Sequence, residues 1–266
     1  MKRLHIIIVG AIIALTVIFS FVFSTKRPSG KTKTSSISYL KEAEGAYKSG
    51  EVQEAKILYE TAKELTEDVN TLKKIQSKIE DINIEMLFSP AVDECSIKYV
   101  VKPKDALVKI ARKFNTTINL IKKANKLESN IIRPGQELKV NTCKFSIAVD
   151  KSQNLLFLKR DGEIIKTYIV STGKDNSTPV GSFKIINKLS NPTWFKTGAV
   201  IPPDSPENIL GSRWMGFDRQ GYGIHGTTDP NNLGKQITLG CVRMSNEEVE
   251  ELFDIIPVGT EVIIVD

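Results

Sequence analysis

The spacing of hydrophobic positions changes along the chain. Residues 4–23 form an almost continuous apolar run. Between Leu40 and Met86, apolar residues recur every three or four positions, which is the period of an amphipathic helix. After Lys98, most apolar residues lie in short runs of β-branched and aromatic residues with turn residues between them, a pattern typical of strands. The chain is therefore predicted to be a multidomain α+β protein.

The apolar run at the start of the chain is about twenty residues long, which is enough to cross the hydrocarbon core of a bilayer. Its exit, from Phe19 to Ser24, fits a signal-peptidase cleavage site poorly because bulky residues occupy the positions that need small ones. We therefore expect residues 1–24 to be an uncleaved, single-pass membrane anchor with a transmembrane helix. A cleaved signal segment is the alternative.

Residues 25–36 are rich in Ser, Thr and Lys, a composition that buries little apolar surface and predicts a tether. Residues 37–90 are predicted to be an all-helical spacer. Its apolar face consists of Leu40, Ala43, Tyr47, Ala55, Leu58, Tyr59, Ala62, Leu65, Leu72, Ile75, Ile79, Ile82 and Met86. The segment from Ala46 to Ala62 resembles part of a single tetratricopeptide (TPR) unit. Because one such unit cannot bury its own face, we expect it to pack as a spacer rather than to form a peptide-binding groove.

Residues 97–142 are predicted to form a strand, two short helices and a strand. The residues that carry this pattern are Tyr99-Val100-Val101, Asp105 as a helix N-cap, Leu107, Ile110, Ala111, Phe114, Ala124-Asn125 and Pro134-Gly135-Gln136-x-Leu138. This pattern resembles a LysM module with a βααβ fold, although Lys104 stands where the family usually has glycine. LysM modules commonly bind glycans that contain N-acetylglucosamine, so the resemblance implies attachment to a cell wall. A module that packs without binding sugar is the alternative.

Residues 144–266 are predicted to form a mostly β domain with one helix near its end, capped by Ser245. The expected strands are 147–149, 155–158, 167–170, 183–186 and 261–265. The overall charge of +6 suits an anionic partner, which leaves nucleic acid, a lipid surface and a bacterial wall open. The hydrophobic content of 41% is enough for a buried core and decides nothing further.

The β domain contains His225, the one histidine outside the apolar run, and Cys241 as its single cysteine. A neighbouring imidazole can take the proton of a thiol and make it nucleophilic. Gly240 allows the backbone to approach a substrate carbonyl, so the amides of Gly240 and Cys241 are candidate oxyanion donors. In an extended segment Arg243 shares a face with Cys241, where it would hold a carboxylate and lower the thiol pKa. One histidine and one cysteine are too few ligands for a zinc site, so no metal is expected.

Two segments of this domain, His225-Gly226-Thr227 and Thr238-Leu239-Gly240-Cys241-Val242-Arg243, resemble the signature of the YkuD-type L,D-transpeptidases. The resemblance implies that Cys241 is the nucleophile and that His225 is its base. It also implies that the main chain at Gly226 orients the imidazole, that amides from Leu239 to Cys241, including Gly240, form the oxyanion hole, and that Arg243 positions substrate. Leu239 departs from the family, many members of which have a polar residue there.

The activity implied by this resemblance is the cross-linking of peptidoglycan stem peptides through a thioester at Cys241, with no cofactor. Peptidoglycan stem peptides and glycan strands would then be the partners, rather than nucleic acid. The enzyme would face the cell wall from the outer side of the cell membrane, or be secreted to the wall if the first segment is cleaved. Two alternatives stay open: an L,D-carboxypeptidase that trims stem peptides, and a non-catalytic peptidoglycan-binding protein.

Cys95 and Cys143 lie on either side of the LysM-like module. If the two strands of the module pair antiparallel, as the resemblance implies, the Cα atoms of these residues come within the roughly 4.4 to 6.8 Å that a disulfide needs. We therefore expect a disulfide that leaves Cys241 as the sole free thiol. An extracytoplasmic location permits this bond. Two reduced structural cysteines are the alternative.

Overall fold

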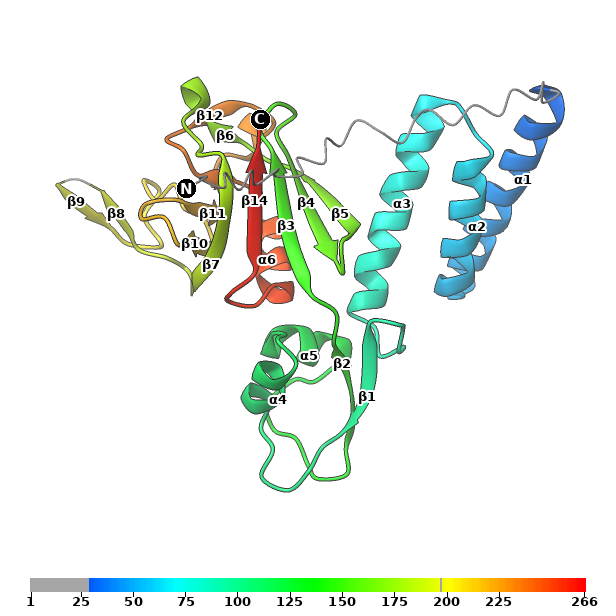
Figure 1. Cartoon of the computed structure of the whole chain (residues 1–266), viewed down its shortest axis with the longest axis horizontal. Helices are drawn as coiled ribbons and strands as arrows, with labels where there is room; N and C mark the ends of the chain where they lie inside the picture. Colours follow the sequence, from blue (N-terminus) through cyan, green and yellow to red (C-terminus); the bar gives the residue numbers. More distant parts are fainter. Residues whose placement is uncertain (1–28, 197) are drawn as a thin grey trace, which may run out of the picture.

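The computed structural model describes residues 29–196 and 198–266. A helical part, a small two-stranded module and a large curved sheet follow one another along the chain (Figure 1). The expected anchor at residues 1–24 lies outside the described residues. Among the helices that the structure describes, none combines the length and the apolar character needed to cross a membrane.

The helical part consists of α1 (Ser29–Lys48), α2 (Val52–Glu64) and α3 (Val69–Leu87). Gly50 ends the first helix with a φ of 81°, a conformation that favours glycine. Asp68 caps α3 by accepting a hydrogen bond from the Thr71 amide at 2.8 Å. The core is made of Ala43, Ala46, Ala55, Tyr59, Ala62, Ile75, Ile79 and Ile82. The predicted helical region is confirmed, and small alanines explain how α1 and α2 come close together.

The predicted tether at residues 25–36 is wrong over the part that the structure describes, because α1 already begins at Ser29. Lysine is a good helix former, and serine and threonine cost only a few tenths of a kcal/mol each, so this composition does not prevent a helix. A tertiary contact favours it. Ser36 is buried and donates its hydroxyl to the carbonyl of Ala62, 26 residues away, at 3.2 Å.

The two-stranded module contains β1 (Ser96–Val100), α4 (Leu107–Lys113), α5 (Ile118–Ala124) and β2 (Glu137–Asn141). β1 and β2 pair antiparallel, with Ser96 opposite Asn141. The module has its own core of Tyr99, Val101, Leu107, Ile110, Ala111, Ile121, Leu138 and Val140. Cys95 and Cys143, just outside the two strands, form a disulfide with their Cα atoms 5.0 Å apart.

The turn before α4 differs from the prediction at one residue. Asp105 is not the N-cap, which is Ala106; the Asp105 carboxylate instead accepts hydrogen bonds from the Lys102 amide and the Tyr99 hydroxyl, both at 2.8 Å. Lys104 has a φ of 71°, in the left-handed region where glycine is favoured. The departure from the usual LysM glycine therefore falls on a position whose backbone conformation suits glycine.

The C-terminal domain is built on an eight-stranded sheet with the order β13-β11-β10-β7-β14-β3-β4-β5 (Figure 1). Its strands are β3 (Phe145–Asp150), β4 (Leu155–Arg160), β5 (Glu163–Ile169), β7 (Gly181–Ser190), β10 (Arg213–Phe217), β11 (Gly223–His225), β13 (Val242–Arg243) and β14 (Glu261–Val265). Two small pairs accompany it: β6 (Thr172–Gly173) with β12 (Gln236–Thr238), and β8 (Trp194–Lys196) with β9 (Ala199–Ile201). The predicted mostly β domain is confirmed.

Helix α6 (Asn246–Ile255) packs against β10 and β11 and buries Val249, Leu252 and Ile255 in the core of this domain. Ser245 is its N-cap, as predicted, and accepts a hydrogen bond from the Glu248 amide at 3.2 Å. The start of α6 is thereby placed beside the end of β11. That is the part of the sheet where the candidate catalytic residues lie.

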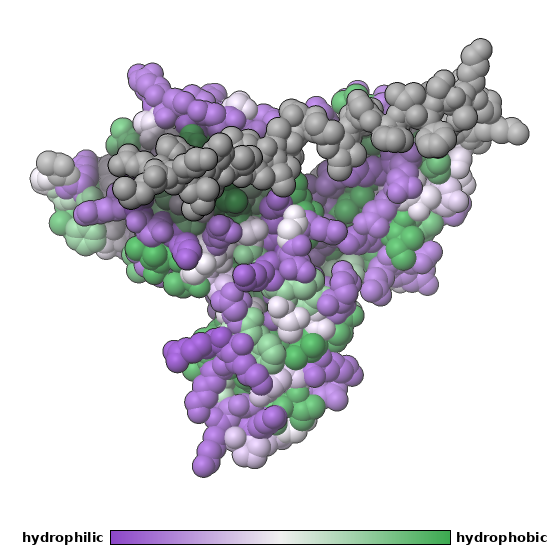
Figure 2. Space-filling view, viewed as in Figure 1, coloured by the Kyte–Doolittle hydropathy of each residue, from purple (hydrophilic) through white to green (hydrophobic). Residues whose placement is uncertain are grey.

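The three parts contact one another through both apolar and polar side chains. Ile84 and Leu87 of α3 and Leu120 of α5 belong to the same buried cluster as the core of the C-terminal domain. α3 lies beside β5, where Lys166 pairs with Asp81 at 2.7 Å and Thr167 donates to Glu80 at 2.8 Å. The C-terminal end of α6 holds the two-stranded module, because Asp254 pairs with Lys123 at 2.7 Å. On the visible face of the helical part and of the two-stranded module, hydrophilic side chains alternate with small hydrophobic patches (Figure 2).

Candidate active site

The parallel pairing of β11 with β13 brings the two sequence motifs together. Ile224 is registered with Val242, and His225 with Arg243. Cys241 immediately precedes this strand. Because side chains alternate along a strand and registered partners project to the same face, His225, Cys241 and Arg243 share one face of the sheet edge. A site divided between two segments of the sequence is thus assembled by a single strand pairing.

His225 is buried and held in one tautomer. Its Nδ1 lies 2.6 Å from the carbonyl oxygen of Gly226, which can only accept, so Nδ1 carries the proton and Nε2 is left as an acceptor. The Trp214 ring stacks on the imidazole at 6.1 Å between centroids. Burial lowers the pKa of His225 to about 4, against the effect of the Gly226 carbonyl and with the help of the Arg243 charge. The imidazole is therefore a neutral base at pH 7.

The Cys241 thiol is partly exposed and lies 3.5 Å from the carbonyl oxygen of Gly221. Burial raises its pKa to about 11, although a hydrogen bond with the Gly223 backbone and the nearby Arg243 act in the opposite direction. The expected effect of Arg243 on the thiol is present, but desolvation outweighs it. The raised pKa of the thiol and the lowered pKa of the imidazole both favour the uncharged forms of the two groups at neutral pH.

One of the predicted oxyanion donors is engaged elsewhere. The Gly240 amide donates to the Thr238 hydroxyl at 3.2 Å, and this hydroxyl donates to the Cys241 carbonyl at 2.7 Å. The Gly240 amide therefore has an acceptor within its own turn, and its role as an oxyanion donor stays a prediction. The Leu239 side chain is 87% exposed.

Gly240 is nevertheless required by the shape of this turn. Its φ is 128°, which side chains rarely permit, and a Cβ there would lie 2.7 Å from Cε1 of Tyr222. The Tyr222 ring thus packs directly on the backbone before the nucleophile. This packing contact of Tyr222 could not be predicted from the sequence pattern. The one indication in the sequence is that Tyr222 lies three residues before His225.

Arg243 is anchored by its backbone and has a free side-chain donor. It exchanges two main-chain hydrogen bonds of 2.8 Å with Ser171, which fixes the loop on the other side of Cys241. Its Nε is buried and has no hydrogen-bond partner among the described side chains. Burial lowers the pKa of the guanidinium, and Asp229 and Cys241 oppose this effect. A guanidinium with an unused buried donor beside the thiol is suited to an anionic ligand group.

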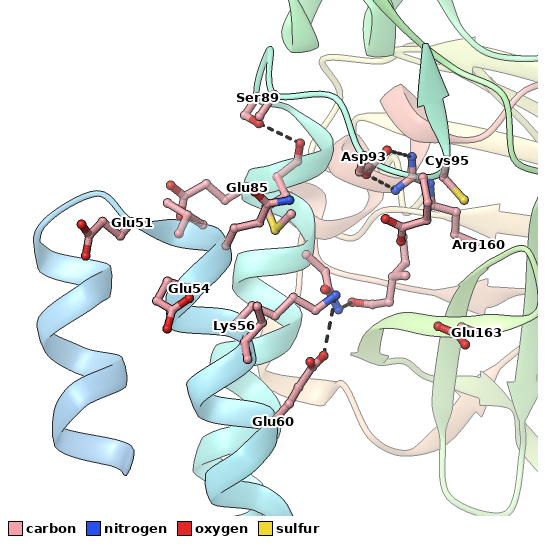
Figure 3. A pocket seen from close by; sticks show the side chains of 18 of the residues that line it. Glu51, Glu54, Lys56, Glu60, Glu85, Ser89, Asp93, Cys95, Arg160 and Glu163 are labelled. Carbon is pink, nitrogen blue, oxygen red and sulfur yellow. Dashed lines mark hydrogen bonds and ion pairs between the residues drawn. The ribbon is translucent and has the colours of Figure 1, made fainter. Parts of the chain in front are cut away.

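A separate cleft of about 1200 Å³ lies between the helical part and the turn from β4 to β5 (Figure 3). The charged residues of its wall are mainly acidic, and apart from Cys95 the wall contains none of the predicted site residues. Arg160 and Asp93 form a bidentate ion pair there, at 2.7 and 3.1 Å. Within the described residues, no three His, Cys, Asp or Glu side chains are grouped as a metal site.

Comparison with known proteins finds family matches for the C-terminal domain and for the two-stranded module. Residues 144–264 match the L,D-transpeptidase catalytic domain, YkuD, and residues 99–141 match the LysM domain. The putative L,D-transpeptidase YqjB of Bacillus subtilis is 44% identical over 126 residues, which are 45% of this chain and 70% of that protein. The putative L,D-transpeptidase YkuD of Bacillus licheniformis is 35% identical over 174 residues, which are 62% of this chain and 97% of that protein.

Among solved structures, the catalytic domain of an L,D-transpeptidase from E. faecium is 26% identical and overlaps with a TM-score of 0.39. The overlap covers 46% of this chain and 97% of that domain. A TM-score of 0.39 does not support a family assignment, which therefore depends on the sequence relatives. Since relatives at 35% and 44% identity are covered over 97% and 70% of their lengths, the chain belongs to the YkuD-type L,D-transpeptidase family.

Proposed function

We propose that this protein is a peptidoglycan L,D-transpeptidase in which Cys241 is the nucleophile and His225 is the base. The observation that supports the proposal is the β11–β13 pairing, which registers His225 with Arg243, two residues after Cys241. The Nδ1–H bond to Gly226 leaves Nε2 free to take a proton. The family to which the chain belongs supports the same reaction.

In the first half of the reaction, Sγ of Cys241 attacks the carbonyl carbon of a diamino acid that precedes a terminal D-Ala. His225 takes the thiol proton at Nε2 as the C–S bond forms. The amides of Leu239 and Cys241 donate to the oxyanion, and Arg243 holds a substrate carboxylate. The amide bond then breaks, the D-Ala amine leaves with the proton from the imidazolium, and the stem peptide stays on Cys241 as a thioester.

In the second half, the side-chain amine of a second stem attacks the thioester. His225 takes a proton from that amine, the C–S bond breaks and the sulfur is reprotonated, which regenerates the starting enzyme. The product is a cross-link between two diamino-acid residues. If water resolved the thioester instead, the enzyme would be an L,D-carboxypeptidase and the product a shortened stem.

We also propose that residues 97–142 are a βααβ LysM-like module that binds glycan strands containing N-acetylglucosamine. The separate core of the module and its Cys95–Cys143 disulfide support a unit that keeps its own shape. In this proposal α1 and α2 form a TPR-like pair that packs on α3 as a spacer. Pull-down with purified peptidoglycan, compared between the full chain and a chain lacking residues 97–142, tests the glycan role.

The location of the enzyme is a further proposal. Residues 1–24 would anchor the chain in the cell membrane, with the catalytic domain facing the cell wall; the length of their apolar run supports this. N-terminal sequencing of protein recovered from the membrane fraction distinguishes an intact anchor from a cleaved segment.

Mass spectrometry of peptidoglycan digested after incubation with the enzyme tests the activity. We expect a new cross-link between two diamino acids with the wild type and none with Cys241→Ala. His225→Ala should slow formation of the covalent stem-peptide adduct by about a hundredfold, the usual scale for loss of a general base. A peptide adduct on the Cys241→Ala protein would overturn the mechanism. Only shortened stems, with ample acceptor present, would favour the carboxypeptidase.

A further inference from the structure

Asn246 is the first residue of α6, and its side chain is not needed to cap that helix. The Ser245 hydroxyl accepts from the Glu248 amide at 3.2 Å and donates to the Glu248 carboxylate at 2.8 Å, which completes the cap. Oδ1 of Asn246 instead accepts two backbone N–H groups from other loops, Ser212 at 3.0 Å and Thr227 at 3.2 Å. A side-chain amide oxygen has two lone pairs, so both bonds form together.

The Thr227 amide is part of the peptide unit whose carbonyl orients the catalytic histidine. The nitrogen of Thr227 and the carbonyl of Gly226 belong to the same peptide bond, and that carbonyl lies 2.6 Å from Nδ1 of His225. Because a peptide unit is planar, a hydrogen bond that holds its N–H end also sets the direction of its C=O end. Consecutive hydrogen bonds also polarise one another. Asn246, the peptide unit and His225 thus form one chain of hydrogen bonds.

Two glycines leave the space that this amide occupies. A Cβ at Gly226 or at Gly211 would lie 2.2 Å from Oδ1 of Asn246, and the Gly211 backbone has a φ of 64°. A Cβ at Gly211 would also lie 2.6 Å from the nitrogen of Thr227. Any side chain at these positions would therefore displace Asn246 from the two amides. The loop before β10 and the loop after β11 therefore both pack closely against Oδ1 of Asn246.

We propose that Asn246 is a positioning residue that holds the imidazole of His225 in the tautomer and orientation in which Nε2 accepts the Cys241 proton. The inference depends on the proposed role of His225 as the base. Asn246 acts through the Gly226–Thr227 peptide and not through substrate. Removing its oxygen leaves the peptide free to turn, and the Nδ1 partner turns with it.

The first test measures the rate at which a stem peptide that ends in D-Ala acylates Cys241 in the full-length protein. The readout is the increase in mass of the intact protein. Asn246→Ala should slow acylation by about tenfold to a hundredfold, the scale of a slight misplacement of a catalytic group. Asn246→Asp should stay within about threefold of the wild type, because a carboxylate accepts both N–H groups. The matched control is Ser245→Ala, which removes the helix cap and should lower the melting temperature while the acylation rate stays at the wild-type value.

The second test reads the tautomer directly by nitrogen NMR of the imidazoles. The chain has only two histidines, His5 and His225, so a His5→Gln background isolates one signal pair. The wild type should show a protonated Nδ1 and a bare Nε2, and Asn246→Ala a mixture of tautomers. Should Asn246→Ala not fold, Asn246→Gln keeps the amide and the helix but displaces the acceptor, and the same losses are expected.

A folded Asn246→Ala protein with the wild-type rate and the wild-type tautomer would overturn the proposal. So would an Asn246→Asp protein that is folded but as slow as Asn246→Ala. If the wild type is not acylated by the stem peptide, the proposed function fails instead. The tautomer comparison then still decides the role of Asn246.

Discussion

Acidification should destabilise the catalytic domain through one buried side chain, His225. In the folded protein its pKa is lowered from 6.5 to about 4, chiefly by burial. The unfolded chain therefore binds one more proton than the folded chain between these two values. Stability consequently rises with pH across this window, and it is lost as the pH falls from about 6.5 towards 4.

The size of the effect follows from the two pKa values. Each unit of difference corresponds to about 1.4 kcal/mol, so the contribution of His225 to the free energy of unfolding should fall by about 2 kcal/mol at pH 5 and by about 3 kcal/mol at pH 4. The full difference applies because the imidazole is only 2% exposed and is shielded from solvent. His225→Gln does not titrate, so this loss should be absent from that variant.

Urea unfolding at a series of pH values between 7 and 4 measures this contribution. Tryptophan fluorescence is a local probe, because both tryptophans of the chain, Trp194 and Trp214, belong to the catalytic domain. Subtracting the His225→Gln curve from the wild-type curve removes the titration of carboxylates that the two proteins share. A difference that stays constant between pH 7 and 4 would refute the lowered pKa of the histidine.

Three further predictions concern stability. Gly240→Ala should lose about 1–3 kcal/mol or more, because it combines a strained φ with a clash against a tyrosine ring; Gly259→Ala, with a φ of 93° and open space, is the control in urea unfolding. Cys95→Ser opens a loop of 48 residues and should destabilise the two-stranded module by about 4 kcal/mol, measured by hydrogen exchange. Alkylation of both disulfide cysteines in secreted protein without prior reduction would show that the bond is absent. Asp93→Ala removes the ion-pair partner of the partly buried Arg160 and should cost about 1–3 kcal/mol by urea unfolding, whereas Asp93→Ala with Arg160→Met should recover part of that loss.

Those features that depend on local pattern could be predicted from the sequence. The period of apolar residues predicted the helical region, and the alternation of β-branched runs with turn residues predicted the mostly β domain. The cap at Ser245 was visible because a cap needs only a few neighbouring residues. The candidate nucleophile and base were also evident, since each lies in a short segment whose residue types recur together in one family.

The features that depend on contacts between distant segments were decided by the tertiary structure alone. Residues 29–36 are helical partly because Ser36 finds a buried acceptor in another helix. The Tyr222 ring packs against the backbone of Gly240, which belongs to a different segment of the chain. Asn246 reaches the histidine loop only once α6 packs beside β11. The raised thiol pKa and the lowered imidazole pKa follow from burial, and burial belongs to the folded chain: no local sequence pattern states how much water a side chain will lose.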